Sequence, residues 1–166
     1  MVKDDKMYSL IESFANKLPQ FPDGRIDYSH SDIAPVITVF ISFKKKVLLL
    51  KRSDKVLTYQ GKWNTVAGYL DELKPIEEKI YEELSEELGL SRMDVKLIHI
   101  GDSYRFIDES EKRTWIVHPV KVELAHDVKI TLDWEHTEYK WIDPDEIDKY
   151  DTVPNAKTSL LKAFDK

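Results

Sequence analysis

Cysteine is absent from the 166 residues of this chain, and glycine is scarce, with five residues. The lack of cysteine excludes a disulfide framework, a thiolate metal site and a cysteine nucleophile. No apolar run approaches the roughly 18 residues needed to cross a membrane, and the opening stretch, MVKDDKMYSL, lacks the apolar core of a signal peptide. We therefore expect a cytoplasmic protein with no membrane partner.

The chain also lacks an excess of positive charge. It carries 25 Lys and Arg against 31 Asp and Glu, which gives a formal net charge of −6. Proteins that bind nucleic acid usually present a basic face, so we expect no nucleic-acid polymer as a partner. A small phosphate ester remains compatible, because a bound cation can supply the missing positive charge. At this length a single domain can bury about 70% of its unfolded surface.

The most informative segment spans residues 68–90, GYLDELKPIEEKIYEELSEELGL. Glu83, Glu86 and Glu87 stand three and four residues apart, a spacing that places their carboxylates on one stripe of a helix. Like charges so arranged repel one another unless a cation lies between them. Hard divalent cations, Mg²⁺ above all, suit such an all-oxygen cluster.

The same segment predicts a helix over about 75–88. Pro75 suits the first helical position, and Gly89 suits the left-handed residue just past the end. The stripe opposite the carboxylates is aliphatic at every fourth residue: Ile76, Ile80, Leu84 and Leu88. This stripe is expected to pack against a sheet.

The segment resembles the Nudix box of the Nudix (MutT-like) hydrolase family, whose pattern is G-x5-E-x7-R-E-U-x-E-E-x-G-U, with U aliphatic. Gly68 matches the first glycine, and the second half of the box is matched in register by Glu83, Leu84, Glu86, Glu87, Gly89 and Leu90. Two positions depart from the pattern, so the box is degenerate. Lys74 stands where the family has glutamate, and Glu82 stands where it has arginine.

The two departures leave two interpretations open. In the family the box arginine orients the catalytic glutamate, which Glu82 cannot do. Glu82 also adds a negative charge beside the cluster unless Lys74, Lys79 or another base compensates. Lys74 and Glu82 are consistent with a reversed salt link, with Lys74 reaching back from the loop. The alternative is that the orientation is lost and activity is low, altered or absent.

The flanking chain extends the resemblance over roughly residues 34–150. Alternating or aliphatic runs predict strands over 36–43, 47–50, 95–100, 114–124 and 137–142, the first two as a hairpin split by Lys44, Lys45 and Lys46. Trp141 is expected in the core. A short helix is expected to begin at Asp143 or Pro144, and a second over 155–164 with Leu160, Leu161 and Phe164 on its buried side. The resemblance implies an α/β fold of the Nudix type, an α/β/α sandwich with a mixed β-sheet.

A candidate boundary lies upstream, over residues 19–35, which are rich in Pro, Asp and Ser and have no periodicity. We divide the chain into an N-terminal helix and connecting loop, 1–33, and a Nudix domain, 34–166. The N-terminal helix is expected over 7–18, with an apolar side made of Leu10, Ile11, Phe14 and Leu18. It is interpreted either as a strap packed on the sandwich or as a lid or dimer contact, which leaves a homodimer possible.

The resemblance implies a divalent-metal site for Mg²⁺ or Mn²⁺. Glu83, Glu86 and Glu87 are the implied catalytic residues and metal ligands, with the backbone carbonyl of Ala67 as a further ligand. A late-loop carboxylate usually completes the site in the family. Glu135 is our choice for it, with Asp133 and Glu138 in reserve; each is equally compatible with ordinary surface charge.

The substrate contacts are predicted less sharply. Candidates are Lys51 and Arg52 for phosphates, Gly68 for close backbone approach, and Trp63 and Tyr104 as stacking partners; Tyr59, Tyr69 and Trp115 are further aromatic candidates that are equally compatible with a core position. The leading hypothesis is metal-dependent hydrolysis of the diphosphate linkage in a nucleoside diphosphate linked to another moiety. The alternative is a Nudix-fold nucleotide-binding or regulatory module with little or no turnover. Isopentenyl-diphosphate isomerase activity is disfavoured, because the isomerases of this fold use a cysteine.

Overall fold

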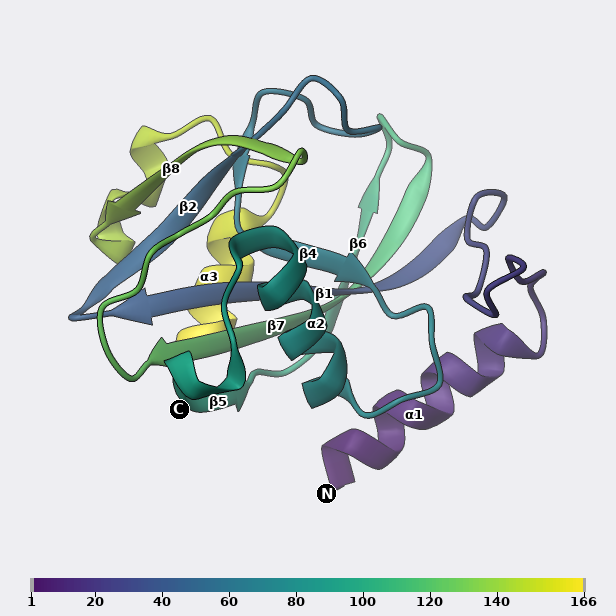
Figure 1. The fold of residues 1–166 in the computed structure, drawn as a ribbon. Coiled ribbons are helices and arrows are strands. Elements are labelled where there is room, and N and C mark those ends of the chain that lie inside the picture. The colour runs from purple at the N-terminus through teal and green to yellow at the C-terminus, as the bar shows by residue number, and fades with distance from the viewer. Residues whose placement is uncertain (1, 166) are drawn as a thin grey trace.

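The computed structural model describes residues 2–165, with side chains from residue 6 onward. Three α-helices and eight strands alternate along this part of the chain (Figure 1). Their bounds are α1 Val2–Ala15, β1 Ile33–Phe43, β2 Lys46–Arg52, β3 Trp63–Asn64, β4 Val66–Tyr69, α2 Ile76–Leu88, β5 Val95–Ile100, β6 Tyr104–Asp108, β7 Arg113–Leu124, β8 His136–Ile142 and α3 Ala156–Phe164, with 3-10 turns at Arg92–Asp94 and Pro144–Lys149. No helix among the described residues is both long and apolar enough to cross a membrane.

The strands form one mixed sheet, as the resemblance to the Nudix family implies. Its main path runs β3-β2-β1-β7-β5, while β4 pairs with β1, β6 with β7 and β8 with β2. β1 and β7 are parallel, and the other pairings are antiparallel. The β1–β2 hairpin turns on Lys44 and Lys45, whose φ angles are 47° and 67°. Two left-handed residues in a two-residue loop match the twist of the flanking strands.

Helices cover both faces of the sheet, which makes the fold an α/β/α sandwich (Figure 1). Neighbouring residues of β1 point to opposite faces, so that Val39 and Ile41 pack beneath α1 and α2 while Phe40 packs against α3. β2 divides in the same way. Strands buried on both faces need apolar residues at every position, which is why these two segments are near-continuous aliphatic runs rather than alternating ones.

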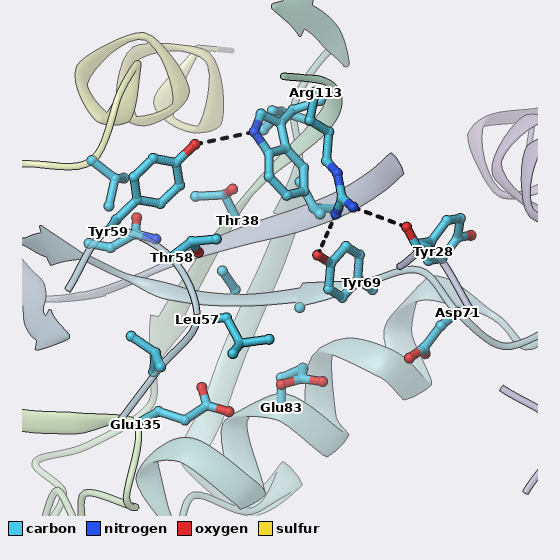
Figure 2. Close-up of a pocket in the computed structure, with 18 of the residues that line it drawn as sticks. Tyr28, Thr38, Leu57, Thr58, Tyr59, Tyr69, Asp71, Glu83, Arg113 and Glu135 are labelled. Carbon is cyan, nitrogen blue, oxygen red and sulfur yellow. Dashed lines mark hydrogen bonds between the residues drawn. The ribbon is translucent and has the colours of Figure 1, made fainter. Parts of the chain in front are cut away.

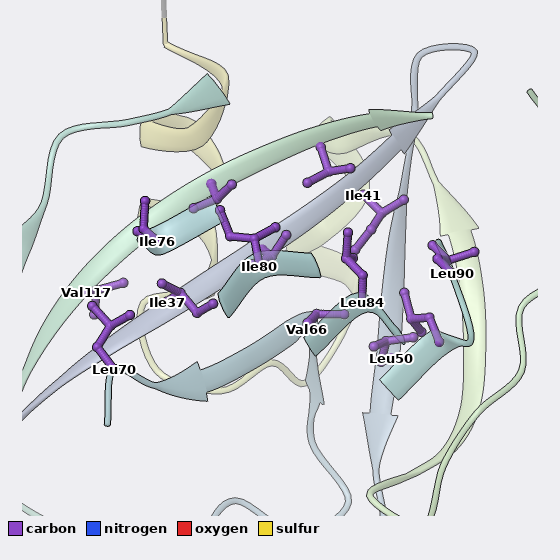
Figure 3. Close-up of a cluster of buried hydrophobic side chains, with 14 of the residues drawn as sticks. Ile37, Ile41, Leu50, Val66, Leu70, Ile76, Ile80, Leu84, Leu90 and Val117 are labelled. Atoms are coloured by element: carbon purple, nitrogen blue, oxygen red, sulfur yellow. The ribbon is translucent and has the colours of Figure 1, made fainter. Parts of the chain in front are cut away.

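Helix α2 follows the prediction closely. Ile76, Ile80 and Leu84 point into the sheet among residues from β1, β2 and β4 (Figure 3), and each is at most 3% exposed. Gly89 ends the helix in the left-handed conformation with φ 70°, and the Leu90 N–H donates to the Leu84 carbonyl. Pro75 lies one position before the first helical residue instead of occupying it.

Three other expectations need correction. Helix α1 begins and ends earlier than the predicted 7–18. Leu161 is 62% exposed, and the buried side of α3 is formed by Ala156, Ser159, Leu160 and Ala163, because adjacent residues of a helix point about 100° apart and cannot share one narrow face. Strand β6 was not predicted, because its five residues are few and two of them, Arg105 and Asp108, are charged.

The segment before β1 packs onto the sandwich. Met7, Ile11, Ile26 and Tyr28 belong to the same buried cluster as the aliphatic side of α2. The Tyr28 hydroxyl donates to the Leu70 carbonyl at 2.6 Å, and the Ile26 N–H donates to the Asp71 carbonyl at 2.8 Å. The segment is therefore a strap on the sandwich. A dimer contact made by α1 stays a prediction.

Candidate functional site

A cavity of about 760 Å³ opens between α2 and the end of the sheet that carries β6 (Figure 2). Most of its lining comes from α2, β4, β6, β7, the strap and the segments 52–59 and 134–135, and β1, β3 and α3 also contribute. We call its carboxylate side, formed by Glu82, Glu83, Glu86 and Glu135, the acidic wall. We call the side formed by Tyr59, Tyr69, Tyr104, Phe106 and Trp115 the aromatic wall.

Helix α2 supplies most of the acidic wall because its polar stripe faces away from the sheet. Glu83 is 9% exposed and lies against β4, where a Cβ added to Gly68 would stand 2.8 Å from the Glu83 Cδ. The absent side chain at position 68 is therefore what lets this carboxylate reach the cavity. Glu86 is exposed at the opening, and the backbone of Ala67 also lines the cavity.

Glu87 lies behind this wall, 2% exposed. Its Oε1 is 3.7 Å from Nε2 of His136, and its Oε2 is a buried atom with no hydrogen-bond partner in the described structure. Carboxylate or ring atoms of Glu87, Glu135 and His136 all lie within 4.8 Å of one another, as ligands of one cation would. His136 was missed from sequence, since a lone histidine beside an acidic turn carries no motif.

Mutual repulsion and burial disturb these carboxylates. Burial, with Glu83 and Glu135 nearby, holds the pKa of Glu87 well above its usual range. Burial, with Asp133 and Glu83, raises the pKa of Glu135 to about 7. Burial, followed by the charges of Glu83 and Glu82, also raises the pKa of Glu86. Burial is the largest cause of each shift, and neighbouring negative charge adds to it; a cation among the carboxylates would favour their charged forms.

The three candidates for the late-loop carboxylate lie in different surroundings. Glu135 lines the cavity. Asp133 accepts a hydrogen bond from the Glu135 N–H at 3.1 Å and lies 3.5 Å from Nδ1 of His136, so it supports the turn. Glu138 is exposed on β8, opposite Lys51, and does not line the cavity.

The reversed salt link is confirmed. The Nζ of Lys74 donates directly to the Glu82 carboxylate and lies 3.3 Å from that of Glu72. Lys74 reaches this position from the loop before α2. The link that the family makes with glutamate and arginine is thus present here with its charges exchanged.

Two of the predicted substrate contacts lie elsewhere. Arg52 lines the cavity, where its Nε donates to the Thr58 carbonyl at 3.0 Å, but Lys51 does not. Adjacent strand residues point to opposite faces, so only one of the two can face the cavity. Trp63 is buried in the α3-side core against Tyr150, with ring centroids 5.4 Å apart. We therefore withdraw Lys51 and Trp63 as substrate contacts; Gly68 and Tyr104 do line the cavity.

Ring contacts and hydrogen bonds fix the aromatic wall. Tyr69 and Trp115 lie 6.0 Å apart, and the Trp115 Nε1–H donates to the Tyr59 hydroxyl at 3.3 Å. Arg113 donates to the Tyr69 hydroxyl at 2.8 Å and to the Tyr28 carbonyl at 3.0 Å (Figure 2). Arg113 and Tyr28 were not among the predicted residues, because 85 positions separate them and only strand pairing brings them together.

Comparisons with known proteins agree with this architecture. The model of the NUDIX domain matches residues 32–164. The nucleoside triphosphatase NudI of Escherichia coli O139:H28 is 25% identical over 123 residues, which cover 70% of this chain and 87% of NudI.

Solved structures are similar in fold. The MutT protein of Methanosarcina mazei Go1 superposes with a TM-score of 0.64 at 21% identity, over 79% of this chain and 92% of that one. The NUDIX domain of Shewanella oneidensis NrtR, solved with ADP ribose, gives 0.66 at 12% identity, over 92% of this chain and 95% of that one.

Proposed function

Because this chain belongs to the Nudix family and is a pyrophosphohydrolase of that class, we propose that it catalyses metal-dependent hydrolysis of the diphosphate linkage in a nucleoside diphosphate joined to another moiety. The observation that carries the proposal is that the acidic and aromatic walls face one cavity. Carboxylates that hold a cation suit the phosphates, and exposed ring faces suit a nucleobase.

The donor set fits Mg²⁺ or Mn²⁺. Its atoms are mainly carboxylate oxygens, one of them buried without a hydrogen-bond partner, and hard divalent cations prefer such ligands. We assign Glu83, Glu86, Glu87 and Glu135 as ligands, with the Ala67 carbonyl and the His136 ring available beside them. When bound, the cation supplies positive charge against the phosphate oxygens and lowers the pKa of a water ligand.

The chain's own residues supply the rest of the chemistry. Glu83 orients the attacking water, or removes its proton, in line with the bond that breaks. Arg52 supplies a guanidinium for a phosphate, and its contact with Thr58 holds it at the cavity edge. The aromatic wall holds the base, which fixes the diphosphate against the carboxylates.

A binding module with little turnover is the second candidate. Glu82 favours it, since the box arginine that orients the catalytic glutamate in the family is absent from this position. The fully matched second half of the box favours catalysis.

A substrate panel tests the proposal. It consists of ADP-ribose, diadenosine tetraphosphate, NADH and a nucleoside triphosphate, each incubated with Mg²⁺ and with Mn²⁺, and the products are resolved by chromatography. We expect cleavage of at least one compound that depends on the cation and is lost in Glu86→Gln. Binding of a panel member by calorimetry without cleavage would favour the binding module instead.

A further inference from the structure

Lys79 is a buried lysine in the middle of α2. It is 6% exposed, and its Nζ lies 3.1 Å from Oε1 of Glu83 and 3.2 Å from Oδ1 of Asp71. Glu83 follows it by four residues, the spacing at which two helical side chains meet. Both Lys79 and Asp71 line the cavity.

Packing does not require a lysine at this position. Burying an ammonium group is costly, and an apolar side chain of similar volume often does as well or better for stability. The cost is tolerated here because two carboxylates flank the group. Lys79, Asp71 and Glu83 form a charged trio at the cavity wall. Because Glu83 belongs to the proposed site, a role in that site explains the buried lysine better than packing does.

The trio is also held by residues outside α2. The backbone of Asp71 accepts the Ile26 N–H at 2.8 Å, and its Oδ2 lies 3.8 Å from Nη1 of Arg25 in the strap. Figure 2 shows Asp71 and Glu83 on the α2 side of the cavity. Lys79 is therefore held from one side by Asp71 and directs its ammonium at Glu83 on the other.

We propose that Lys79 is the positioning residue for Glu83, doing from one turn earlier what the family's box arginine does from position 82. The inference rests on the proposed function. Glu82 pairs with Lys74 and is not available to orient Glu83. Lys79 instead contacts one carboxylate oxygen of Glu83, and the missing side chain of Gly68 leaves room for the rest of that carboxylate. The two roles of one arginine are thus divided between two lysines: Lys74 keeps the salt link, and Lys79 orients the glutamate.

Steady-state kinetics on the panel compound that the wild type cleaves fastest test this division. Lys79→Met should lower kcat about 10- to 100-fold, the usual cost of losing a residue that orients a ligand, with KM changed less than about 3-fold. Lys79→Arg should recover most of kcat, and Asp71→Asn should show a smaller loss. Lys96→Met, an exposed lysine paired with Glu123 on the sheet, is the matched control and should behave as wild type.

The decisive arm repeats Lys79→Met in a Lys74→Glu/Glu82→Arg background. An arginine at position 82 should orient Glu83, so the loss there should fall below about 3-fold. Equal losses in both backgrounds would assign Lys79 a merely structural role and overturn the inference. Unchanged or raised activity of Lys79→Met in the wild-type background would overturn it as well.

A readout without turnover completes the test. A crystal structure of Lys79→Met should show the Glu83 carboxylate displaced from Gly68, and that of Lys79→Arg should show it retained. If Lys79→Met fails to fold, Lys79→Arg and Asp71→Asn decide by the same criteria. A wild type that cleaves no panel compound removes the proposed function and this inference together; an active wild type insensitive to Lys79 removes the inference alone.

Discussion

The two walls of the cavity are stabilised in opposite ways. The aromatic wall is held by its own contacts: the Tyr104 and Phe106 rings stack, and the polar groups of Tyr59, Tyr69 and Trp115 all have hydrogen-bond partners. The acidic wall and Glu87 behind it combine burial with like charge, and the pKa values of Glu86, Glu87 and Glu135 are raised. Lysines pair with Glu82 and Glu83, whereas a cation would relieve the remaining carboxylates.

This contrast separates two kinds of contribution. A preformed aromatic surface binds the ground state and the transition state alike, so damage to it should appear in KM. Carboxylates that act through a cation contribute where charge develops, so damage to them should appear in kcat. Substitutions in each wall test this division between effects on KM and effects on kcat.

The largest effect is expected in the acidic wall. Glu83→Gln and Glu86→Gln should each lower kcat at least about 10²-fold, because each removes a charge that acts around the metal. The melting temperature of Glu86→Gln should hold or rise as repulsion falls, whereas that of Glu83→Gln should fall, because the buried Lys79 ammonium then keeps only Asp71 as a charged partner. Glu77→Gln, exposed on the same helix, is the control. Wild-type turnover in both mutants would remove the catalytic assignment, and a loss of stability in both would point to a structural role.

The aromatic wall should respond in KM. Stacking of a base on an aromatic side chain contributes about 1–3 kcal/mol, so Trp115→Leu should raise KM roughly 10-fold while kcat changes less than about 3-fold. Tyr139→Leu, exposed on β8 outside the cavity, serves as control. A fall in kcat with unchanged KM would show that the walls do not divide the work in this way.

Stability should depend on pH through Glu135. Burial raises its pKa to about 7 in the folded protein, against 4.5 for a solvated glutamate. The folded state therefore binds more protons between these values, and the free energy of unfolding falls as pH rises. At pH 8 in the presence of a chelator, Glu135→Gln should therefore be more stable than the wild type by on the order of 1 kcal/mol, once solvent screening is allowed for. This difference corresponds to a melting temperature roughly 2–4 °C higher.

The same comparison at pH 4 should show no difference, since the carboxyl is then protonated in both states. Added Mg²⁺ at pH 8 should reduce the difference in melting temperature between the two proteins by stabilising the wild type. A melting difference that is equal at the two pH values would mean that packing, and not charge, separates the two proteins.

The smallest effect concerns the reversed pair of Lys74 and Glu82, the second of which belongs to the acidic wall. Lys74 and Glu82 are 22% and 32% exposed, so their coupling should be modest, at least about 0.5 kcal/mol in a double-mutant cycle of urea unfolding. Glu82→Arg alone places two cations together and should be harmful. Adding Lys74→Glu should restore wild-type activity or better. A single Glu82→Arg that gains activity would instead favour the binding-module interpretation.

The sequence predicted those parts of the molecule whose local structure and contacts depend on residues close together in the chain. Helix α2 is fixed by its aliphatic ladder and its terminal residues, and the Lys74–Glu82 link follows from charges eight residues apart. Glu135 could be chosen because it precedes a strand that resembles the family's late strand. In each case the relevant contact is local or lies within one motif.

The parts that were missed depend on distant pairing. Arg113, at the start of β7, donates to Tyr28 in the strap, and His136 reaches Glu87 from a strand about 50 residues away in sequence. No local pattern marks such residues. The errors at Lys51 and Trp63 have a related origin, because the orientation of a strand residue depends on register, and register is set by partners that the sequence does not name.

The parallel pairing of β1 with β7 also has a consequence for how the molecule is made. It extends from Ile33 opposite Thr114 to Ser42 opposite Glu123, so residues some 80 positions apart must meet before the sheet closes. Pairings of such long range are slow to form. A nascent chain that has emerged as far as residue 100 holds the whole of α2 but lacks β7 and, with it, the Trp115 part of the aromatic wall. A defect in strand pairing far from the cavity would therefore lower the yield of active molecules while leaving the turnover of each folded molecule unchanged.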